Sequence, residues 1–427
     1  MKYFGTDGIR GVIGVDLNKR KIKKIAKGLV RFYSKYKLKK ILLVGNDSRI
    51  SSDYILSIFS SVLLSCGIQI DNIGICSSPC LAFVAKKFNY PLAMMISASH
   101  NSSEYNGIKF FNTNGEKISE KTELILEKLI DTKNWKDEKN FSTQTNVEYL
   151  KNCYITYLKE MKHFDFPIII DCANGGACDI SKAVFEKSKF INSNYDGLNI
   201  NLNSGCTNIE FLRTLCIKER KIGIALDGDA DRITIVDENG SLITGDKILY
   251  ILSKFYLKVS DKIVGTIYSN TGLEKSLKSR NIELIRANVG DKNVYEMMKK
   301  TKSTIGGENA GHIILRQYFN TGDGLLTGIV ICNILNISKS SLRELLIDYK
   351  QYYQANDSIR LDSKFKLNED LKLIINKYER SNVRIIIRPS GTEPILRILV
   401  ECEQKEIADS ILKKLKNYIN SSIGIKN

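Results

Sequence analysis

Histidine is scarce in this sequence: His100, His163 and His312 are the only three among 427 residues. The ten cysteines are scattered and form no CxxC pair. Because zinc sites built from cysteine and histidine need clustered ligands, this pattern argues against a zinc protein. Cysteines spaced in this way are typical of free, buried thiols in a reducing compartment.

Long apolar runs are also missing. No segment approaches the roughly 20 apolar residues that cross a bilayer, and the opening MKYFGTDGIRGVIG lacks the apolar core of a secretion signal. Hydrophobic residues make up 43% of the chain and charged residues 26%, a balance typical of a protein with a sizeable buried core. We therefore expect a cytoplasmic protein without a membrane partner.

Acidic residues are outnumbered: 47 aspartates and glutamates stand against 64 lysines and arginines, a formal net charge of +17. This balance suggests nucleic-acid binding, which would show as a steeply salt-dependent affinity. Residues 18–37, however, place their lysines around an apolar stripe at helical spacing, as on a solvated helix face. No basic motif interleaved with aromatic residues indicates nucleic-acid recognition, so we expect no nucleic-acid partner.

Strand-like and helical segments alternate in the first part of the chain. The expected elements are a helix at 19–36, a strand at 41–44, a helix at 53–65, a strand at 68–73, a helix at 80–88 and a strand at 92–96. This alternation predicts a parallel sheet covered by helices, with ligands beyond the carboxyl ends of the strands. Further strand–loop segments lie at 167–176, 222–240, 262–315 and 382–401, with a helix near 404–419 and candidate domain boundaries near 150, 255 and 355.

Asp227, Asp229 and Asp231 alternate with small residues between two strand-like segments. Three converging carboxylates repel one another, and an oxygen-preferring divalent cation relieves that repulsion. The stretch also fits an EF-hand calcium loop, except that Arg232 occupies the position of the turn glycine and the flanks are strand-like. An ordinary polar hairpin is the remaining alternative.

Two further loops carry groups that suit a phosphate and a sugar. RPSGTEPILR offers guanidinium groups, hydroxyls and backbone amides, a combination that suits a phosphate dianion, from Arg388, Ser390, Gly391, Thr392 and Arg397. GGENAGH offers Glu308, Asn309 and His312 on a glycine-rich turn, with polar groups that suit sugar hydroxyls or amines. Taken singly, either loop also fits a surface connection.

Ser99 follows the strand at 92–96, within SASHN. A hydrolase triad is disfavoured, because the adjacent His100 would generally project away and no GxSxG elbow is present. Beside three aspartates and a cation, a serine suits phosphoryl transfer; once phosphorylated it would carry a charge of about −1.5 to −2. The alternative is a structural turn after a strand.

In this order, SASHN with NGIKF, DGDADR, GGENAGH and RPSGTEP resemble the α-D-phosphohexomutase family over nearly the whole chain. The opening KYFGTDGIRG and Asn309 resemble the members that act on glucosamine phosphates; glucose and mannose mutases tend to carry methionine at the latter position. The resemblance implies an α/β fold of four domains around a central cleft, three α/β domains with mixed or parallel sheets and a smaller C-terminal α+β domain. The expected ranges, with the loop that each carries, are 1–150 (phosphoserine), 151–255 (metal), 256–355 (sugar) and 356–427 (phosphate).

The resemblance also implies a role for each loop. Ser99 would be the phosphoserine and, with Asp227, Asp229 and Asp231, would hold one Mg²⁺ per subunit. Glu308 and Asn309 would meet the sugar, and the non-reacting phosphate would be held by Arg388, Ser390, Gly391, Thr392 and Arg397. The transferring phosphoryl group would be surrounded by Arg10, His100, Lys109 and His312, with Lys109 as the general base.

The implied activity is a magnesium-dependent interconversion of glucosamine 6-phosphate and glucosamine 1-phosphate through glucosamine 1,6-bisphosphate, which serves as intermediate and activator. The product would feed UDP-N-acetylglucosamine and cell-wall synthesis, and a homodimer is the family expectation. Three alternatives remain open: a glucose or mannose phosphate mutase of the same fold, a magnesium-dependent phosphatase that needs an aspartyl nucleophile but no Ser99, and a basic nucleic-acid-binding protein.

Overall fold

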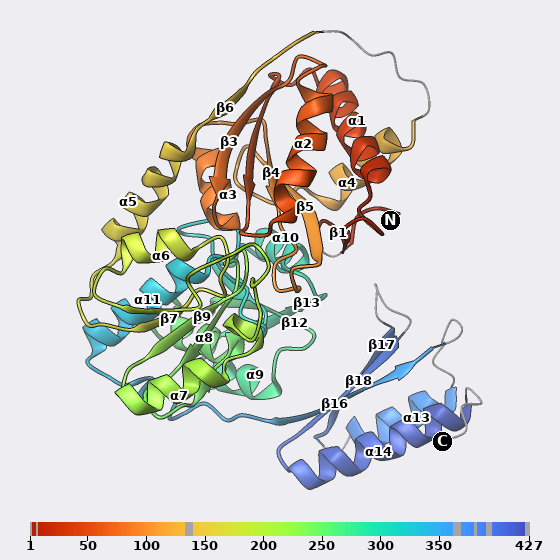
Figure 1. Cartoon of the computed structure of the whole chain (residues 1–427). Coiled ribbons are helices and arrows are strands. Elements are labelled where there is room, and N and C mark those ends of the chain that lie inside the picture. Colours follow the sequence, from red (N-terminus) through yellow and green to blue (C-terminus); the bar gives the residue numbers. More distant parts are fainter. Residues whose placement is uncertain are drawn as a thin grey trace.

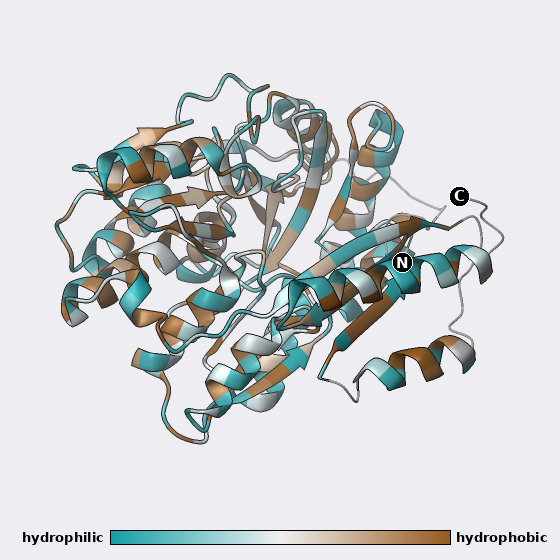
Figure 2. Cartoon of the chain, turned by 90° about the horizontal axis from the view of Figure 1, so that it is seen from below, coloured by the Kyte–Doolittle hydropathy of each residue, from teal (hydrophilic) through white to brown (hydrophobic). Residues whose placement is uncertain are grey.

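A computed structural model describes residues 2–5, 7–132, 140–361, 369–379, 382–389 and 395–422. The strands form four sheets, and helices cover them (Figure 1). Coloured by hydropathy, the central strands are mostly hydrophobic, whereas the surrounding helices mix hydrophilic and hydrophobic segments (Figure 2). Within the described residues, no helix has both the length and the apolar character needed to span a bilayer.

The first sheet has the strand order β1-β5-β4-β2-β3-β6. Its strands are β1 (Ile9–Val12), β2 (Ile41–Asn46), β3 (Gln69–Ile75), β4 (Leu92–Ile96), β5 (Tyr105–Asn112) and β6 (Gln144–Asn146). Its helices are α1 (Lys19–Tyr36), α2 (Ser51–Leu63), α3 (Ser78–Lys87) and α4 (Glu120–Ile130). The helix predicted at 19–36 and the strand predicted at 92–96 are confirmed to the residue.

The strands predicted at 41–44, 68–73 and 92–96 pair in parallel, as expected, and the sheet that contains them is mixed. β2 pairs in parallel with β3 and β4, but β5 pairs antiparallel with both β4 and β1. The cause is the connection between β4 and β5, residues 97–104, which is too short for a crossover helix and returns the chain beside β4. The SASHN segment occupies this turn, beyond the carboxyl end of β4.

β4 is apolar throughout because both of its faces are buried. Leu92, Met94 and Ile96 belong to the core under α1, α2 and α4, whereas Ala93 and Met95 belong to the core on the α3 side. The α3-side core continues into the second and third sheets. The turn that carries Ser99 is therefore anchored by a strand that cannot shift without disturbing two cores.

The second sheet, in the order β11-β10-β9-β7-β8, contains β7 (Ile169–Asp171), β8 (Lys189–Ile191), β9 (Gly223–Leu226), β10 (Ile233–Val236) and β11 (Leu242–Ile243). The third, in the order β13-β12-β14-β15, contains β12 (Lys262–Thr266), β13 (Glu283–Ala287), β14 (Ile305–Gly307) and β15 (Ile313–Leu315). The accompanying helices are α5 (Lys151–Met161), α6 (Cys178–Val184), α7 (Glu210–Glu219), α8 (Gly245–Tyr256), α9 (Thr271–Lys278), α10 (Asp291–Thr301), α11 (Gly324–Ser338) and α12 (Leu342–Leu345), with 3-10 turns at Glu148–Leu150 and Gly205–Thr207. Two antiparallel pairs, β9–β10 and β14–β15, carry the acidic loop and the GGENAGH loop in their turns.

The C-terminal sheet is antiparallel, in the order β16-β18-β17, and has a core of its own. Its elements are β16 (Tyr353–Arg360), α13 (Glu369–Glu379), β17 (Arg384–Pro389), β18 (Ile395–Cys402) and α14 (Lys405–Ser422). It lies to one side of the other three sheets (Figure 1). Arg384 connects it to the loop after β12 by donating to the carbonyl oxygens of Ile267 and, at 2.8 Å, Ser269. The domain boundaries near 150, 255 and 355 stay predictions.

The fold depends on how the buried helix α11 begins. Asp323 caps it by accepting from the Leu326 amide at 2.9 Å and also accepts from the Tyr154 hydroxyl at 2.8 Å. Asp323→Ala should therefore destabilise the protein by about 2–4 kcal/mol, since it removes a cap and leaves a buried hydroxyl unpaired. Thermal unfolding measures the change. Ser341→Ala, which removes the cap of the short helix α12, is the matched control with a smaller expected loss; equal losses would contradict the prediction.

Candidate active site

Ser99 is fully buried in the turn between β4 and β5, and its backbone is left-handed with φ +54°. This conformation is uncommon for a residue with a Cβ. The Ser99 hydroxyl donates to Asp227 Oδ2 at 2.5 Å, which joins the first sheet to the acidic loop of the second. The serine therefore meets the carboxylates at which the sequence predicts a cation.

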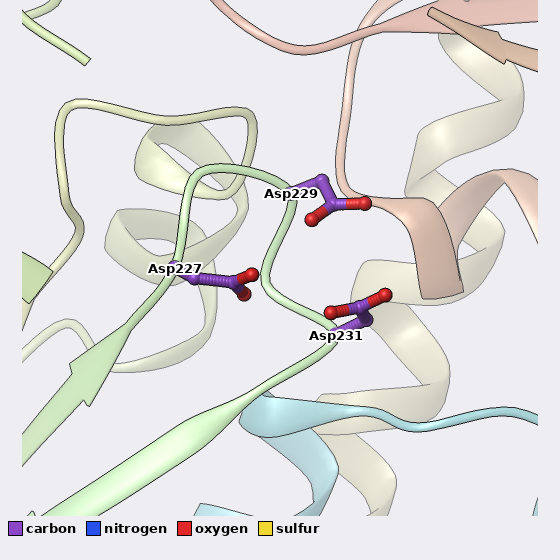
Figure 3. A group of neighbouring side chains, drawn as sticks. All are labelled: Asp227, Asp229 and Asp231. Atoms are coloured by element: carbon purple, nitrogen blue, oxygen red, sulfur yellow. The ribbon is translucent and has the colours of Figure 1, made fainter. Parts of the chain in front are cut away.

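The three aspartates of the β9–β10 turn converge (Figure 3). One carboxylate oxygen from each lies within 4.8 Å of the others, and all three residues are buried. Asp229 Oδ1 and Asp231 Oδ1 have no hydrogen-bond partner within the described part of the chain, although both are buried. Unpaired buried oxygens at such a convergence fit a divalent cation. Strands rather than helices flank the turn, which excludes an EF-hand.

Repulsion among these carboxylates is only partly compensated. Burial, and then the charges of Asp231 and Asp229, raise the pKa of Asp227 to about 7. Burial acts in the same direction on Asp231, but the positive charges of Lys109 and His312 outweigh it and hold the pKa of that carboxyl well below its usual range. For Asp227, the aspartate in contact with Ser99, burial and the two neighbouring carboxylates therefore disfavour ionisation.

Lys109 on β5 faces the cluster and is almost completely buried. Its Nζ lies 2.7 Å from Asp229 Oδ2 and 2.9 Å from Asp7 Oδ2. Burial favours the neutral amine, yet the charges of Asp229 and Asp7 outweigh burial and raise the pKa of Lys109. The side chain is an ammonium in this arrangement. It balances negative charge, and it must release its proton before it can act as a base.

Lys117, Asp7 and Asp291 belong to the same buried network, although sequence reasoning did not single them out. Lys117 Nζ lies 2.6 Å from Asp7 Oδ1 and 2.5 Å from Asp291 Oδ2. The available signal was weak: Asp7 lies within KYFGTDGIRG and Asp291 within the loop segment NVGDKNV. A single charged residue has no recognisable pattern in a chain of which 26% is charged.

The two histidines at the site differ in charge. His312 Nδ1 lies 3.6 Å from Asp231 Oδ1, and its Nε2 lies 3.4 Å from Asp291 Oδ2. Burial lowers the pKa of His312, but these two carboxylates outweigh burial and raise it. Burial, followed by the charge of Arg232, lowers the pKa of His100 to about 4. At neutral pH His100 is therefore neutral, whereas the two carboxylates beside His312 stabilise its protonated form.

The remaining predicted residues lie around this cluster and toward the third sheet. Arg10 on β1 forms an ion pair with Asp7, and its Nη1 lies 3.4 Å from Asn101 Oδ1 in the serine turn. Glu308 and Asn309 are half-buried in the β14–β15 turn. Arg10 therefore reaches the serine turn, whereas Glu308 and Asn309 belong to the turn of the third sheet.

The two arginines predicted to hold phosphate lie on neighbouring strands of the C-terminal sheet. Arg388 on β17 lies directly opposite Arg397 on β18, a position in which like charges destabilise a sheet, so a bound anion would stabilise the pair. Arg397 and Asn309 line a cavity of about 750 Å³, and Arg388 and Lys117 line another of about 630 Å³. The three other residues predicted to hold phosphate lie outside the described residues: Ser390, Gly391 and Thr392.

Comparisons with known proteins find similarity along most of the chain. Models of the phosphoglucomutase/phosphomannomutase family match the chain as α/β/α domain I over residues 1–137, α/β/α domain III over residues 244–352 and the C-terminal domain over residues 359–417. The phosphoglucosamine mutase of Bacillus subtilis is 34% identical over 448 aligned residues, which cover 100% of both chains.

Solved structures share the fold. A putative phosphomannomutase from Thermus thermophilus superposes with a TM-score of 0.80 at 20% identity and covers 98% of each chain. The N-acetylphosphoglucosamine mutase of Aspergillus fumigatus, solved in complex with GlcNAc-6P and magnesium, has a TM-score of 0.70 at 16% identity and covers 99% of this chain and 96% of its own. The α/β architecture is therefore that of the hexomutase structures.

The carboxylate cluster should make thermal stability depend on divalent cations. A cation that binds only the folded protein adds about 2.7 kcal/mol at 100 times its dissociation constant, so the unfolding temperature should rise with added cation and fall with a chelator. Asp227→Asn should lose most of this rise. Asp237→Asn, a change at a buried aspartate beyond β10 and outside the cluster, should keep it. An equal rise in wild type and Asp227→Asn would contradict the prediction.

Proposed function

Because the chain belongs to the phosphoglucomutase/phosphomannomutase family of α-D-phosphohexomutases, we propose that it interconverts glucosamine 6-phosphate and glucosamine 1-phosphate. The observation that carries the proposal is the contact between Ser99 Oγ and Asp227, which sets a buried serine on a carboxylate cluster that fits a cation. Likeness to a phosphoglucosamine mutase over the full chain favours the amino sugar as substrate.

The reaction consists of two phosphoryl transfers. In the first, the P–Oγ bond of phosphorylated Ser99 breaks, a P–O1 bond forms on glucosamine 6-phosphate, and the O1 proton passes to Oγ. The resulting glucosamine 1,6-bisphosphate, which also serves as activator, reorients within the cleft. In the second transfer the P–O6 bond breaks, a new P–Oγ bond forms, and the Oγ proton passes to O6. Positioning and charge neutralisation account for most of the acceleration in such transfers.

The acidic cluster contributes the metal site. Asp227, Asp229 and Asp231 would hold one Mg²⁺ together with phosphorylated Ser99. Bound Mg²⁺ supplies neutralisation of the charge on the transferring group. Asp229 and Asp231 each have a buried oxygen that accepts no hydrogen bond within the described residues, and these two oxygens support this assignment.

Four side chains surround the transferring group: Arg10, His100, Lys109 and His312. The positive charges of Lys109 and His312 lie beside Asp231 and so face the position of the phosphoryl group. Lys109 is the proposed proton acceptor, and it must release its own proton before it can act as one. Arg10 reaches the serine turn through Asn101.

The substrate would lie between the β14–β15 turn and the C-terminal sheet. Glu308 and Asn309 would contact the sugar. Arg388 and Arg397, opposite one another, would hold the non-reacting phosphate together with the loop residues Ser390, Gly391 and Thr392. The cavity shared by Asn309 and Arg397 supports this placement.

The enzyme would act in the cytoplasm as a homodimer, with domain boundaries near 150, 255 and 355. Its product would feed UDP-N-acetylglucosamine and cell-wall synthesis. It needs no nucleic-acid or membrane partner. A glucose or mannose phosphate mutase is the alternative within this fold, and a magnesium-dependent phosphatase is the alternative from another class.

Turnover separates these functions. With magnesium and a trace of the matching 1,6-bisphosphate, glucosamine 6-phosphate should react with a higher kcat/KM than glucose 6-phosphate or mannose 6-phosphate. Ser99→Ala should reduce mutase turnover to background, because no other side chain carries the phosphoryl group. Release of inorganic phosphate that survives Ser99→Ala would indicate a phosphatase. A preference for glucose or mannose would keep the mechanism and change the substrate.

Asn309 should contribute to the choice of sugar. Asn309→Met removes an amide that can pair with the charged amine, a loss of about 1.5–3 kcal/mol, or roughly 10- to 150-fold in kcat/KM for glucosamine 6-phosphate. The value for glucose 6-phosphate should change less. Asn208→Met, at an exposed position, is the control. An equal loss of kcat/KM for both sugars would show that Asn309 does not recognise the amine.

A further inference from the structure

The backbone of Ser99 is held by other side chains. A residue with a Cβ keeps the left-handed conformation only where its surroundings impose it. The bond from the Ser99 hydroxyl to Asp227 does not impose it, because a side chain can rotate about χ1. The carbonyl oxygen of Ser99, by contrast, accepts from Arg49 at 3.0 Å and from Asn201 at 2.8 Å.

Arg49 holds the serine turn from within the first sheet. It lies between β2 and α2, and its side chain is fully buried. Nε pairs with Asp47 Oδ2 at 3.0 Å. The two Nη atoms donate to the backbone carbonyls of Ser99, Asn101, Ser102 and Tyr105. All five N–H groups are thus used, and the rigid guanidinium plane fixes these carbonyls relative to one another.

Asn201 holds the same turn from the second sheet. It lies in the segment between β8 and α7, and its Nδ2 donates to Ser99 O at 2.8 Å and to Asn101 O at 2.9 Å. The acidic loop is packed against this contact: a Cβ on Gly228 would lie 2.6 Å from Ser99 O and 2.9 Å from Asn201 Nδ2. The carbonyl oxygens of Ser99 and Asn101 therefore each receive donors from both sheets.

We propose that Asn201 and Arg49 are positioning residues for phosphoryl transfer, which act as a clamp on the carbonyl oxygens of Ser99 and Asn101. The inference rests on the proposed mutase function and adds two residues that donate hydrogen bonds to the serine turn. Phosphorylated Ser99 carries about −1.5 to −2 charges beside three carboxylates, so repulsion pushes the turn away from the acidic loop. The clamp opposes that displacement because its donors hold the carbonyl oxygens of Ser99 and Asn101 from both sheets.

The two-step reaction makes this restraint important for rate. Oγ must be in line first with O1 and later with O6, and a displacement of about 1 Å can cost roughly 100-fold in rate. Sugar and phosphate contacts do not involve the clamp, because Asn201 and Arg49 donate to backbone oxygens of the serine turn. Loosening the clamp should therefore lower kcat and leave KM nearly unchanged.

Asn201 is the better residue to test, because removing Arg49 would leave the buried Asp47 without its cation and would endanger folding. Asn201→Asp keeps the shape of the side chain but replaces its donor by an acceptor that faces two carbonyl oxygens. Asn201→Gly removes the donor and tolerates the backbone φ of +57°. Asn203 supplies the matched control, since it lies in the same segment, is exposed and also has a left-handed backbone, at φ +49°.

The experiment measures kcat and KM for glucosamine 6-phosphate, the unfolding temperature, and the fraction of Ser99 phosphorylated after incubation with the 1,6-bisphosphate. For Asn201→Asp and Asn201→Gly we expect kcat to fall about 10- to 100-fold, with KM within about twofold of wild type. The phosphorylated fraction should reach its plateau more slowly. Asn203→Asp and Asn203→Gly should match wild type in every measurement.

Each outcome of this experiment either supports or overturns the clamp. Wild-type kcat in Asn201→Gly, while Ser99→Ala is inactive, overturns the clamp and leaves the mutase standing. Equal losses in the Asn201 and Asn203 variants, or a loss confined to KM, also overturn it. If Asn201→Asp fails to fold, Asn201→Gly decides. Wild-type protein that neither turns over sugar phosphates nor becomes phosphorylated on Ser99 overturns the proposed function, and the clamp with it.

Discussion

The mutual repulsion of Asp227, Asp229 and Asp231 is the constraint on which the site depends, because buried carboxylates at this spacing cannot all ionise without compensation. The chain compensates with Lys109 from the first sheet and His312 from the third. These positive charges do not fully offset burial and repulsion, which together raise the pKa of Asp227. A phosphoryl group on the adjacent Ser99 would add negative charge here and would increase the need for a bound cation.

Glycine makes this convergence sterically feasible, because the turns of successive sheets touch backbone to backbone. A Cβ on Gly228 would lie 2.6 Å from the Ser99 carbonyl oxygen, and one on Gly311 only 2.0 Å from that of Ile233. Gly311 also has φ +92°, which other residues rarely adopt. A side chain at either position would push these loops apart.

The sequence predicted those elements and motifs that have a local residue pattern. The apolar run of β4 and the helical stripe of α1 gave the bounds of these elements to the residue. The polar motifs around Ser99 and Asp227 contain residues that are in contact in the structure. The antiparallel return of β5 was missed, because alternation of strands and helices does not encode strand direction. Lys117 and Asn201 were missed for a related reason: each matters through one contact with a residue far away in the sequence, here Asp7 and Ser99.

The position of Ser99 between two sheets has a consequence for biosynthesis of the protein. Its hydroxyl acceptor, Asp227, and one of its carbonyl donors, Asn201, follow it by more than 100 residues in the chain. A nascent chain that has completed only the first sheet therefore has a serine with neither its carboxylate partner nor its full backbone support. The phosphorylation proposed for Ser99 should therefore follow the folding of the second sheet against the first.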